Sequence, residues 1–204
     1  MNSLLFKAEM IRAIQRDLKT QTRRVINLDL DNRGLRYCNE KTGWEDWHGN
    51  PVKCPYGKPG DERWVRENFW CWGKWQDYLD GEKKRQRFVD MTYEERPVRY
   101  VADNETFSMG NYLYGVGYHK RPSIYMPRKY SRISVRVIDI RVERIQDITE
   151  QDAISEGAES GWSGLKNPYK SGFAELWDSI NEKRGYGWYE NPWVWVVDFE
   201  RITI

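Results

Sequence analysis

Side chains able to do chemistry gather at three places along the chain. The run Leu18-Lys19-Thr20-Gln21-Thr22-Arg23-Arg24 packs two hydroxyls and three cations into seven residues, just past a predicted helix. The other two places are residues 60–67 and residues 149–157, and the latter includes Glu156. A hydroxyl, an amine and a carboxylate converging on one cavity would suit nucleophilic catalysis, with an attacking oxygen, a base and a group that orients or shares protons. The same residues also fit a basic surface strand and an ordinary helix end, so the pattern leaves both interpretations open.

The order of these short motifs resembles the ASCH family of the PUA-like superfamily. That family opens with a helix leading into a Gly-x-Lys-Thr-x-Thr-x-Arg-like run, matched here by residues 13–24, with Leu18 in place of the glycine before the lysine. Gly60-Asp61 matches its Gly-Asp turn, Ile148-Thr149-Glu150 its Leu-Thr-Glu-type helix start, and Val194 to Ile202 its closing strand. The chain is most similar to the longer ASCH proteins of phages and prophages.

The resemblance implies a catalytic set. Bacterial ASCH amidohydrolases that deacetylate N4-acetylcytidine use a proposed Lys, Thr and Glu, which fall here on Lys19, Thr22 and Glu156, with Arg23 and Arg24 binding substrate. Thr22 would attack the acyl carbon, Lys19 would take its proton, and Glu156 would position the substrate or shuttle a proton. A base role requires a Lys19 pKa far below the usual value of about 10.4. A charged Lys19 would instead contact an oxyanion or a phosphate. The resemblance implies neither a metal nor a cofactor, and the substrate would be an N4-acylated cytidine or a related modified nucleoside.

Two other functions stay open. PUA-like barrels resemble RNA-binding modules, and some ASCH proteins are ribonucleases. Residues 119–136 contain six basic and no acidic residues. The tyrosines in or beside this segment could stack on bases. The candidate nucleic-acid-binding residues are Lys120, Arg121, Arg128, Lys129 and Arg132, with Tyr118, Tyr125 and Tyr130 as candidate stacking residues. The third alternative is a phage accessory or morphogenesis protein without catalysis.

Composition excludes several classes of protein. The 204 residues are 39% hydrophobic with a mean hydropathy of −0.87, and no stretch is apolar enough for a membrane span. The N-terminal residues do not resemble a secretion signal, so we expect a cytoplasmic protein. Eleven Trp, thirteen Tyr and six Phe supply the apolar area that a disordered chain lacks. The charge is nearly balanced, with 33 basic and 31 acidic residues. The sequence leaves the oligomeric state open.

The cysteines suggest free thiols in a reducing cytosol, with a metal site as the alternative. Cys38, Cys54 and Cys71 are odd in number and form no CxxC pair, which argues against a disulfide framework. Together with His48 they contain the donors of a Cys3His zinc site, but their spacing matches no tight ligand hairpin.

Periodicity predicts the secondary structure. The best-defined strand covers residues 131–145, where the apolar face shifts by one residue and predicts a β-bulge near Val137–Asp139. The best-defined helix has Thr149 as its N-cap, Asp152 three residues on, and Gly157 as its stop. Further strands are predicted at 4–6, 61–69, 96–102 and 193–202, and loops over 27–60 and 103–127. One further helix carries Met10, Ile11, Ile14 and Leu18, and another carries Phe173, Leu176, Trp177 and Ile180. A short helix is predicted within 73–95.

Few helices and about five strands predict an α+β fold, a PUA-like small β-barrel with flanking helices. In the last strand Trp193, Trp195, Val197 and Phe199 should face inward, and Asp198 and Glu200 should face water. We expect a single domain over residues 1–204, with long loop insertions at about 27–56 and 73–120.

Overall fold

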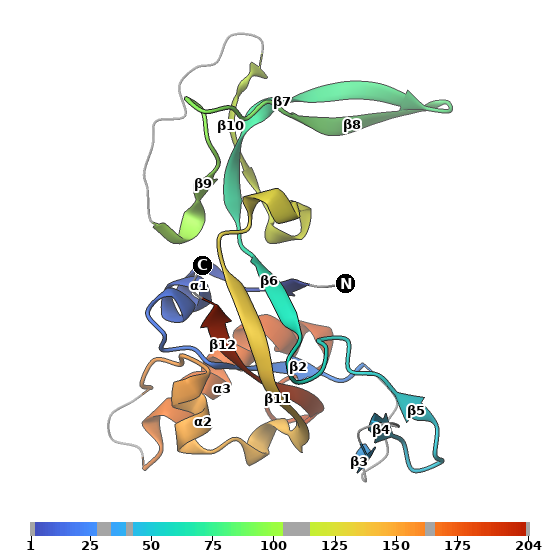
Figure 1. Ribbon diagram of the computed structural model, residues 1–204, viewed down its shortest axis with the longest axis vertical. Coiled ribbons are helices and arrows are strands. Elements are labelled where there is room, and N and C mark those ends of the chain that lie inside the picture. The colour runs from blue at the N-terminus through green and yellow to red at the C-terminus, as the bar shows by residue number, and fades with distance from the viewer. Residues whose placement is uncertain (1–2, 28–33, 40–42, 104–114, 162–165, 203–204) are drawn as a thin grey trace. The chain divides into compact units, whose positions relative to one another are not determined.

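A computed structural model describes residues 3–27, 34–39, 43–103, 115–161 and 166–202 (Figure 1). The fold is mixed α+β and rich in sheet, as predicted. The chain divides into two compact units. Unit 1 comprises Met1–Ser3, Ala13–Arg63 and Ile133–Ile204, and unit 2 comprises Leu4–Arg12 and Trp64–Arg132. The expectation that the whole chain is one domain stays a prediction.

The largest sheet has five strands in the order β1-β6-β11-β12-β2. Their bounds are β1 (Ser3–Leu5), β6 (Glu62–Arg66), β11 (Ser134–Arg144), β12 (Trp193–Ile202) and β2 (Gln21–Val25). The unit boundaries fall within β1 and β6, so unit 1 holds all of β11, β12 and β2. The described strands run as an open path from β1 to β2, and the predicted small barrel is therefore not confirmed.

Strand β11 contains the predicted bulge. Its antiparallel pairing with β12 shifts register between Val137 and Asp139, which pair with the consecutive residues Phe199 and Asp198. The extra residue, Ile138, is 50% exposed, whereas Val137 is buried. The bulge lets the buried Val137 and the partly buried Ile140 and Val142 pack in the same core, which a regular two-residue alternation could not do.

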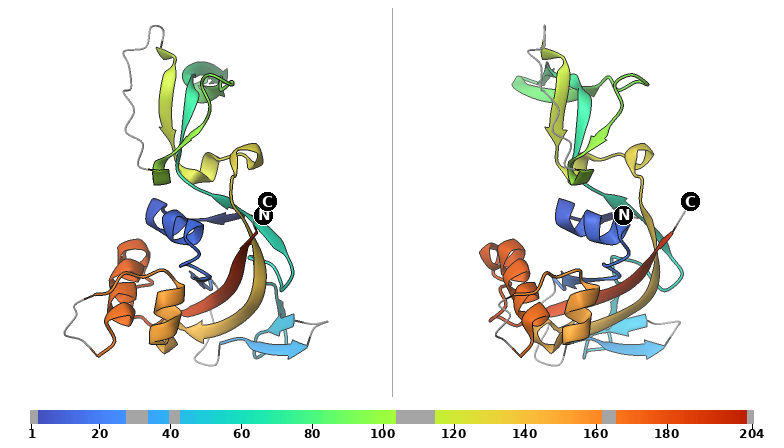
Figure 2. Two further views of the ribbon diagram at one scale, coloured as in Figure 1. Left: turned by 60° about the vertical axis from the view of Figure 1, so that its left-hand side comes forward. Right: turned by 90° about the vertical axis from the view of Figure 1, so that its left-hand side faces the viewer.

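Strand β12 is buried on both faces, which differs from the predicted one-sided burial. Val194 and Val196 pack with the helices on one face, while Trp195 and Val197 belong to a second core on the other face. Figure 2 shows the orange helices and the light-blue strands on opposite sides of β12. A strand buried on both faces has a continuous apolar run, and Val194 to Val197 is such a run.

Helices α2 (Glu150–Ser155) and α3 (Pro168–Asn181) form the first core with β12. Helix α2 has the predicted capping box, in which Thr149 and Asp152 each accept a hydrogen bond from the other's backbone N–H. Gly157 ends it with a φ of 73°, a conformation that favours glycine. The buried α3 residues are Phe173 and Trp177, two members of the predicted apolar stripe, and Asn181.

Three short strands within residues 27–60 correct the expectation of a loop. They are β3 (Arg36–Asn39), β4 (Gly43–Glu45) and β5 (Pro51–Val52), paired in that order. Trp44 stacks edge-on against Trp195, with ring centroids 5.4 Å apart, and this contact joins the small sheet to the second core. The pairing of short strands depends on partners that local periodicity does not reveal.

Helix α1 (Ala8–Gln15) is shorter than expected. Ile11 and Ile14 are buried, but Leu18 lies beyond the helix and is 58% exposed. Asp17 has a φ of 56°, and Leu18 and Lys19 both donate backbone hydrogen bonds to Ala13. This left-handed turn ends the helix and delivers the chain into β2.

Unit 2 is built around a four-stranded antiparallel sheet. Its strands are β7 (Phe69–Asp80), β8 (Lys83–Asp90), β9 (Arg99–Tyr100) and β10 (Gly117–Arg121). Phe69, Cys71 and Met126 form its core. The hairpin of β7 and β8 replaces the short helix predicted within 73–95, and the strand predicted over 96–102 is reduced to β9 and a 3-10 turn over Val101–Asp103. Strand β10 lies within the segment 103–127 that was predicted as loop, of which residues 104–114 are outside the described residues.

Candidate functional site

Strand β2 forms the end of the large sheet and carries the predicted lysine–threonine run. Gln21, Thr22 and Arg23 pair with Asp198, Val197 and Val196 of β12. Directly paired residues share a sheet face. Arg23 therefore lies on the helix-covered face with Val196, whereas Thr22 lies on the opposite face with Val197.

Lys19 and Glu156 come together although they are 137 positions apart in the chain. The Lys19 Nζ lies 2.6 Å from Glu156 Oε2, and neither side chain is more than 4% exposed. The same nitrogen donates to the Gln21 and Glu156 carbonyl oxygens, each at 2.7 Å. All three donors of a charged ammonium group are thus matched by acceptors.

The position of the ammonium follows from the sheet register. Phe199 N–H donates to the Thr20 carbonyl, so the carbonyl groups of Thr20 and Thr22 point toward β12. The Gln21 carbonyl then points to the free edge of β2, where it accepts from Lys19. The turn after α2 reaches the same place, since Thr20 N–H donates to the Ser155 carbonyl. Lys19 therefore bonds the end of α2 to the edge of β2.

The surroundings of Lys19 lower the pKa of its amine. Burial is the largest cause, the Glu156 carboxylate opposes it, and the positive charges of Arg24 and Arg23 add to the lowering. A lysine base requires a lowered pKa, and the direction of this shift agrees with that requirement.

Arg23 is the second buried cation at this site. Its side chain is fully buried and contacts Glu143 at 3.1 Å, Asp152 at 3.3 Å and Glu156 at 3.4 Å. It also donates to the Gln21 side-chain oxygen. Arg23 was expected to bind substrate, but these contacts place it within the protein's own ion-pair network.

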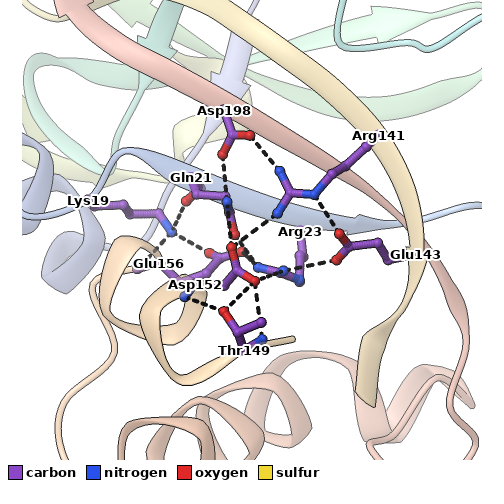
Figure 3. A network of polar contacts seen from close by, with 9 residues as sticks. All are labelled: Lys19, Gln21, Arg23, Arg141, Glu143, Thr149, Asp152, Glu156 and Asp198. Carbon is purple, nitrogen blue, oxygen red and sulfur yellow. Dashed lines mark hydrogen bonds and ion pairs between the residues drawn. The ribbon is translucent and has the colours of Figure 1, made fainter. Parts of the chain in front are cut away.

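The network in Figure 3 extends beyond the predicted residues. Arg141 contacts Glu143, Asp152 at 3.1 Å and Asp198. Gln21 donates to Asp152 at 3.1 Å and to Asp198. Three cations therefore face four carboxylates, contributed by β2, β11, α2, β12 and the residues just before β2 and just after α2. Gln21, Arg141 and Glu143 were not among the residues predicted for the site, and Asp152 and Asp198 were predicted in other roles. Charged residues at alternate positions of β11 were the available signal.

Arg24 shares the sheet face of Thr22, since it pairs with Trp195. Burial is the largest cause of a lowered Arg24 pKa, Tyr56 and Glu156 oppose the lowering, and Arg184 adds to it. Thr22 is 4% exposed. The structure thus joins Lys19 and Glu156 directly and places Thr22 and Arg24 on the other face of the same strand.

The basic residues predicted to bind nucleic acid have varied surroundings in unit 2. Arg132 is held by Glu67 at 2.8 Å and by Asp103 at 2.7 Å, and Lys129 lies 3.5 Å from Asp90. The other three lie against aromatic rings: Lys120 over Trp70, Arg121 over Trp75, Phe88 and Tyr125, and Arg128 over Trp64.

The tyrosines proposed for base stacking also differ from one another. Tyr118 is buried and its hydroxyl donates to the Pro97 carbonyl, so it is a core residue. The Tyr130 hydroxyl donates to Asp90. Tyr125 is 61% exposed, so its ring can reach a ligand.

The described residues contain no group of three or more His, Cys, Asp or Glu side chains placed to hold a metal ion. The three cysteines are free thiols. Burial raises the pKa of Cys54 to about 11 and that of Cys71 to about 12, which keeps both thiols protonated at neutral pH. Within the described part of the chain, no helix has the length and apolar character needed to span a membrane.

Comparison of the chain with protein-family models, with curated proteins and with solved structures found no match.

Proposed function

We propose that the chain is a metal-independent amide hydrolase that acts on an N4-acylated cytidine or a related modified nucleoside. The proposal combines the resemblance to ASCH amidohydrolases with one observation. That observation is the buried contact of Lys19 with Glu156, 2.6 Å long, at the free edge of the strand that carries Thr22. Two distant segments supply this pair, and its residue types are those that the resemblance implies.

A neutral Lys19 would activate the nucleophile. Burial is the largest cause of the lowered Lys19 pKa, and it favours the neutral amine because it penalises the ammonium charge. The Glu156 carboxylate, 2.6 Å away, would hold the amine in place. The amine then accepts the Thr22 hydroxyl proton while the oxygen attacks the acyl carbon.

The remaining steps return the site to its starting state. The tetrahedral intermediate expels the cytosine amino group, which takes the proton from Lys19, and an acyl ester remains on Thr22. Water then hydrolyses the ester, so that one amide and one water yield a carboxylic acid and an amine. This mechanism requires the Thr22 hydroxyl to meet the lysine at the edge of β2 when substrate is bound.

The test is release of cytidine from N4-acetylcytidine and a panel of acyl homologues, followed by chromatography. Thr22→Val removes the hydroxyl at nearly constant volume and should lower the rate by about 10² or more, whereas Thr22→Ser should retain activity. Thr20→Val is the matched control, because Thr20 is an exposed neighbour. Lys19→Met and Glu156→Gln should each lower the rate of cytidine release about as much as the double substitution does, because the pair acts as a unit.

Two results would contradict the proposal. One is a wild-type protein that releases no cytidine from any member of the panel. The other is turnover by Thr22→Val at the wild-type rate. Circular dichroism of each variant separates loss of catalysis from loss of fold.

The alternative of RNA binding through residues 120–132 has less support from the contacts. Arg132 and Lys129 are paired with carboxylates of unit 2, and Tyr118 is in its core. Binding of nucleic acid is better supported elsewhere in unit 2.

A further inference from the structure

We propose that the hairpin of β7 and β8 binds the phosphate backbone of double-stranded DNA through one basic face. This ribbon lies outside the candidate active site, and its role does not depend on the proposed hydrolase activity. Its far part, Trp75–Arg87, is exposed at every residue. In Figure 1 the two strands lie side by side and extend well past β9 and β10 of the same sheet.

The ribbon is a regular antiparallel pair. Eight consecutive residue pairs join it, from Gly73 with Asp90 to Asp80 with Lys83. The two loop residues are Gly81 and Glu82, and Gly81 has a φ of 62°. A glycine with positive φ at the first of two loop positions is typical of a type II′ turn, whose twist matches the strands. The exposed end therefore has a defined register and two defined faces.

Charge separates onto these two faces. Paired residues share a face, and the contacts of Arg87 with Gln76 and Tyr78 agree with that assignment. The basic face contains Lys74, Gln76, Tyr78, Asp80, Lys83, Arg85, Arg87 and Val89. The opposite face contains Gly73, Trp75, Asp77, Leu79, Lys84, Gln86, Phe88 and Asp90. The first face thus presents four cations and one carboxylate, and the second presents one cation and two carboxylates.

The single carboxylate of the basic face does not neutralise it. Asp80 contacts Arg85 at 2.9 Å, but both side chains are more than half exposed. An exposed ion pair of this kind is weak and exchanges readily for another anion. Lys83, Arg85 and Arg87 alternate along β8 and therefore follow one another at about 6.8 Å, a row suited to successive phosphates.

The base of the ribbon is held in place. The Trp75 and Phe88 rings pack edge to face, with centroids 5.5 Å apart, and the Arg121 guanidinium lies 4.8 Å and 4.4 Å from their centres. A side chain on Gly73 would come 2.2 Å from the Val89 carbonyl oxygen, so the strands approach closely there. A ribbon fixed at its base presents its cations without a large ordering cost.

The geometry favours duplex DNA among polyanions. The major groove of B-form DNA admits a two-stranded β-ribbon, whereas the major groove of A-form RNA is too narrow. A single strand would favour open aromatic surfaces, and the basic face offers only Tyr78. Binding to an anionic membrane would favour basic and apolar residues on the same side, but here Trp75 and Leu79 lie opposite the cations.

The test measures binding to a labelled 20-base-pair DNA duplex by fluorescence anisotropy between 50 and 200 mM salt. The ribbon variant is Lys83→Gln/Arg85→Gln/Arg87→Gln. Its control is Lys53→Gln/Lys58→Gln/Lys183→Gln, which removes three charges from exposed positions of unit 1. Each phosphate contact contributes about 0.9 to the slope of log affinity against log salt. The ribbon variant should have a slope shallower by about 2.7, and wild type should lose about 40-fold more affinity across this range than the variant.

A single-residue comparison sharpens the test. Lys83 and Lys84 are adjacent and carry the same charge, but they lie on opposite faces. Lys83→Gln should lower the slope by about 0.9, and Lys84→Gln should leave it unchanged. Equal effects of the two, equal binding by wild type and the ribbon variant, or no binding to duplex DNA would each overturn the proposal. Tighter binding to a matched RNA duplex, to the single strand or to phosphatidylserine vesicles would overturn the choice of DNA.

Discussion

Lys19 shows how a single buried charge can connect two elements. Its ammonium group is bound by two carbonyl oxygens and one carboxylate, and the residues that supply them, Gln21 and Glu156, are each only 4% exposed. A buried charge is tolerated only when it is paired and hydrogen-bonded. Because the partners come from β2 and from the end of α2, the ion pair also fixes where Glu156 lies.

Replacing Lys19 should therefore destabilise the protein strongly. Lys19→Met keeps the length of the side chain but leaves the Glu156 carboxylate buried without its nearest cation, which should cost about 3–5 kcal/mol of unfolding free energy. Urea denaturation measures the loss. Asp17→Asn removes the exposed pair between Asp17 and Arg201 and should cost far less unfolding free energy. Equal losses for the two variants would show that the Lys19 pair is no more important than a surface contact.

Asp152 gives the network a pH dependence. Burial raises its pKa, but hydrogen bonds from Thr149 and Gln21 and the charge of Arg23 outweigh burial and bring the pKa to about 2. Its pKa in the unfolded chain is about 3.9, so the stabilisation is complete above about pH 5 and is lost as the pH falls toward 2.

Asp152→Asn should accordingly flatten the acid side of the stability profile. We expect the substitution to lower the free energy of unfolding by about 1 kcal/mol at pH 7, a value already reduced for solvent screening, and to change it little at pH 2. Urea midpoints between pH 2 and pH 7 measure it. Glu175→Gln, at an exposed position of α3, should follow the wild-type profile. A constant difference between Asp152→Asn and wild type at every pH would contradict this assignment.

At the scale of elements, the turn after α2 determines how closely the helix approaches β2. Gly157 has a φ of 73°, and a Cβ there would lie 3.1 Å from the Ala13 Cβ and 3.2 Å from the Lys19 Cβ. A larger residue would strain the backbone and also push against the lysine. Glycine at this position therefore allows the contact between Lys19 and Glu156.

Two glycine substitutions separate these effects. Gly185 has a similar φ of 79°, but a Cβ there would meet nothing within 4 Å. Gly185→Ala should lower the free energy of unfolding by about 1–2 kcal/mol because of the left-handed backbone alone. Gly157→Ala should lower it by at least about 1 kcal/mol more and should also reduce any cytidine release. Thermal unfolding and the release assay measure both quantities, and equal costs at the two positions would rule out crowding as the reason for Gly157.

At the scale of the whole molecule, charge is distributed unevenly between the two units. Unit 1 has 18 basic and 21 acidic residues, a net charge of −3, whereas unit 2 has 15 and 10, a net charge of +5. The near-neutral total conceals this difference. A basic unit suits a polyanion, and the candidate hydrolase site lies in the acidic unit.

The two proposals therefore predict separate footprints in hydrogen exchange. Duplex DNA should slow amide exchange in the ribbon, Trp75–Arg87, and leave Gln21–Val25 unchanged. A non-hydrolysable N4-acylcytidine analogue should do the reverse. Protection of both segments by either ligand would contradict the assignment of the two ligands to different units.

The sequence by itself determined the features whose causes are local. The capping box of Thr149 and Asp152, the stop at Gly157 and the bulge at Val137 each depend on residues a few positions apart, within reach of a periodicity or spacing argument. The α+β class followed from the number of such elements. Lys19 and Glu156 were candidates from their types and order, although their contact was not derivable from spacing alone.

The tertiary structure decided the features that depend on pairing between distant segments. The register of β2 with β12 put Thr22 and Arg23 on opposite faces, and the register of β11 with β12 brought Arg141 to Asp198. Residues 73–95 contain many charged residues and little alternation of apolar ones, so their ribbon becomes recognisable only when β7 pairs with β8. Alternate residues of an extended strand share a face by themselves, but only the pairing decides which residues of the neighbouring strand join them on that face.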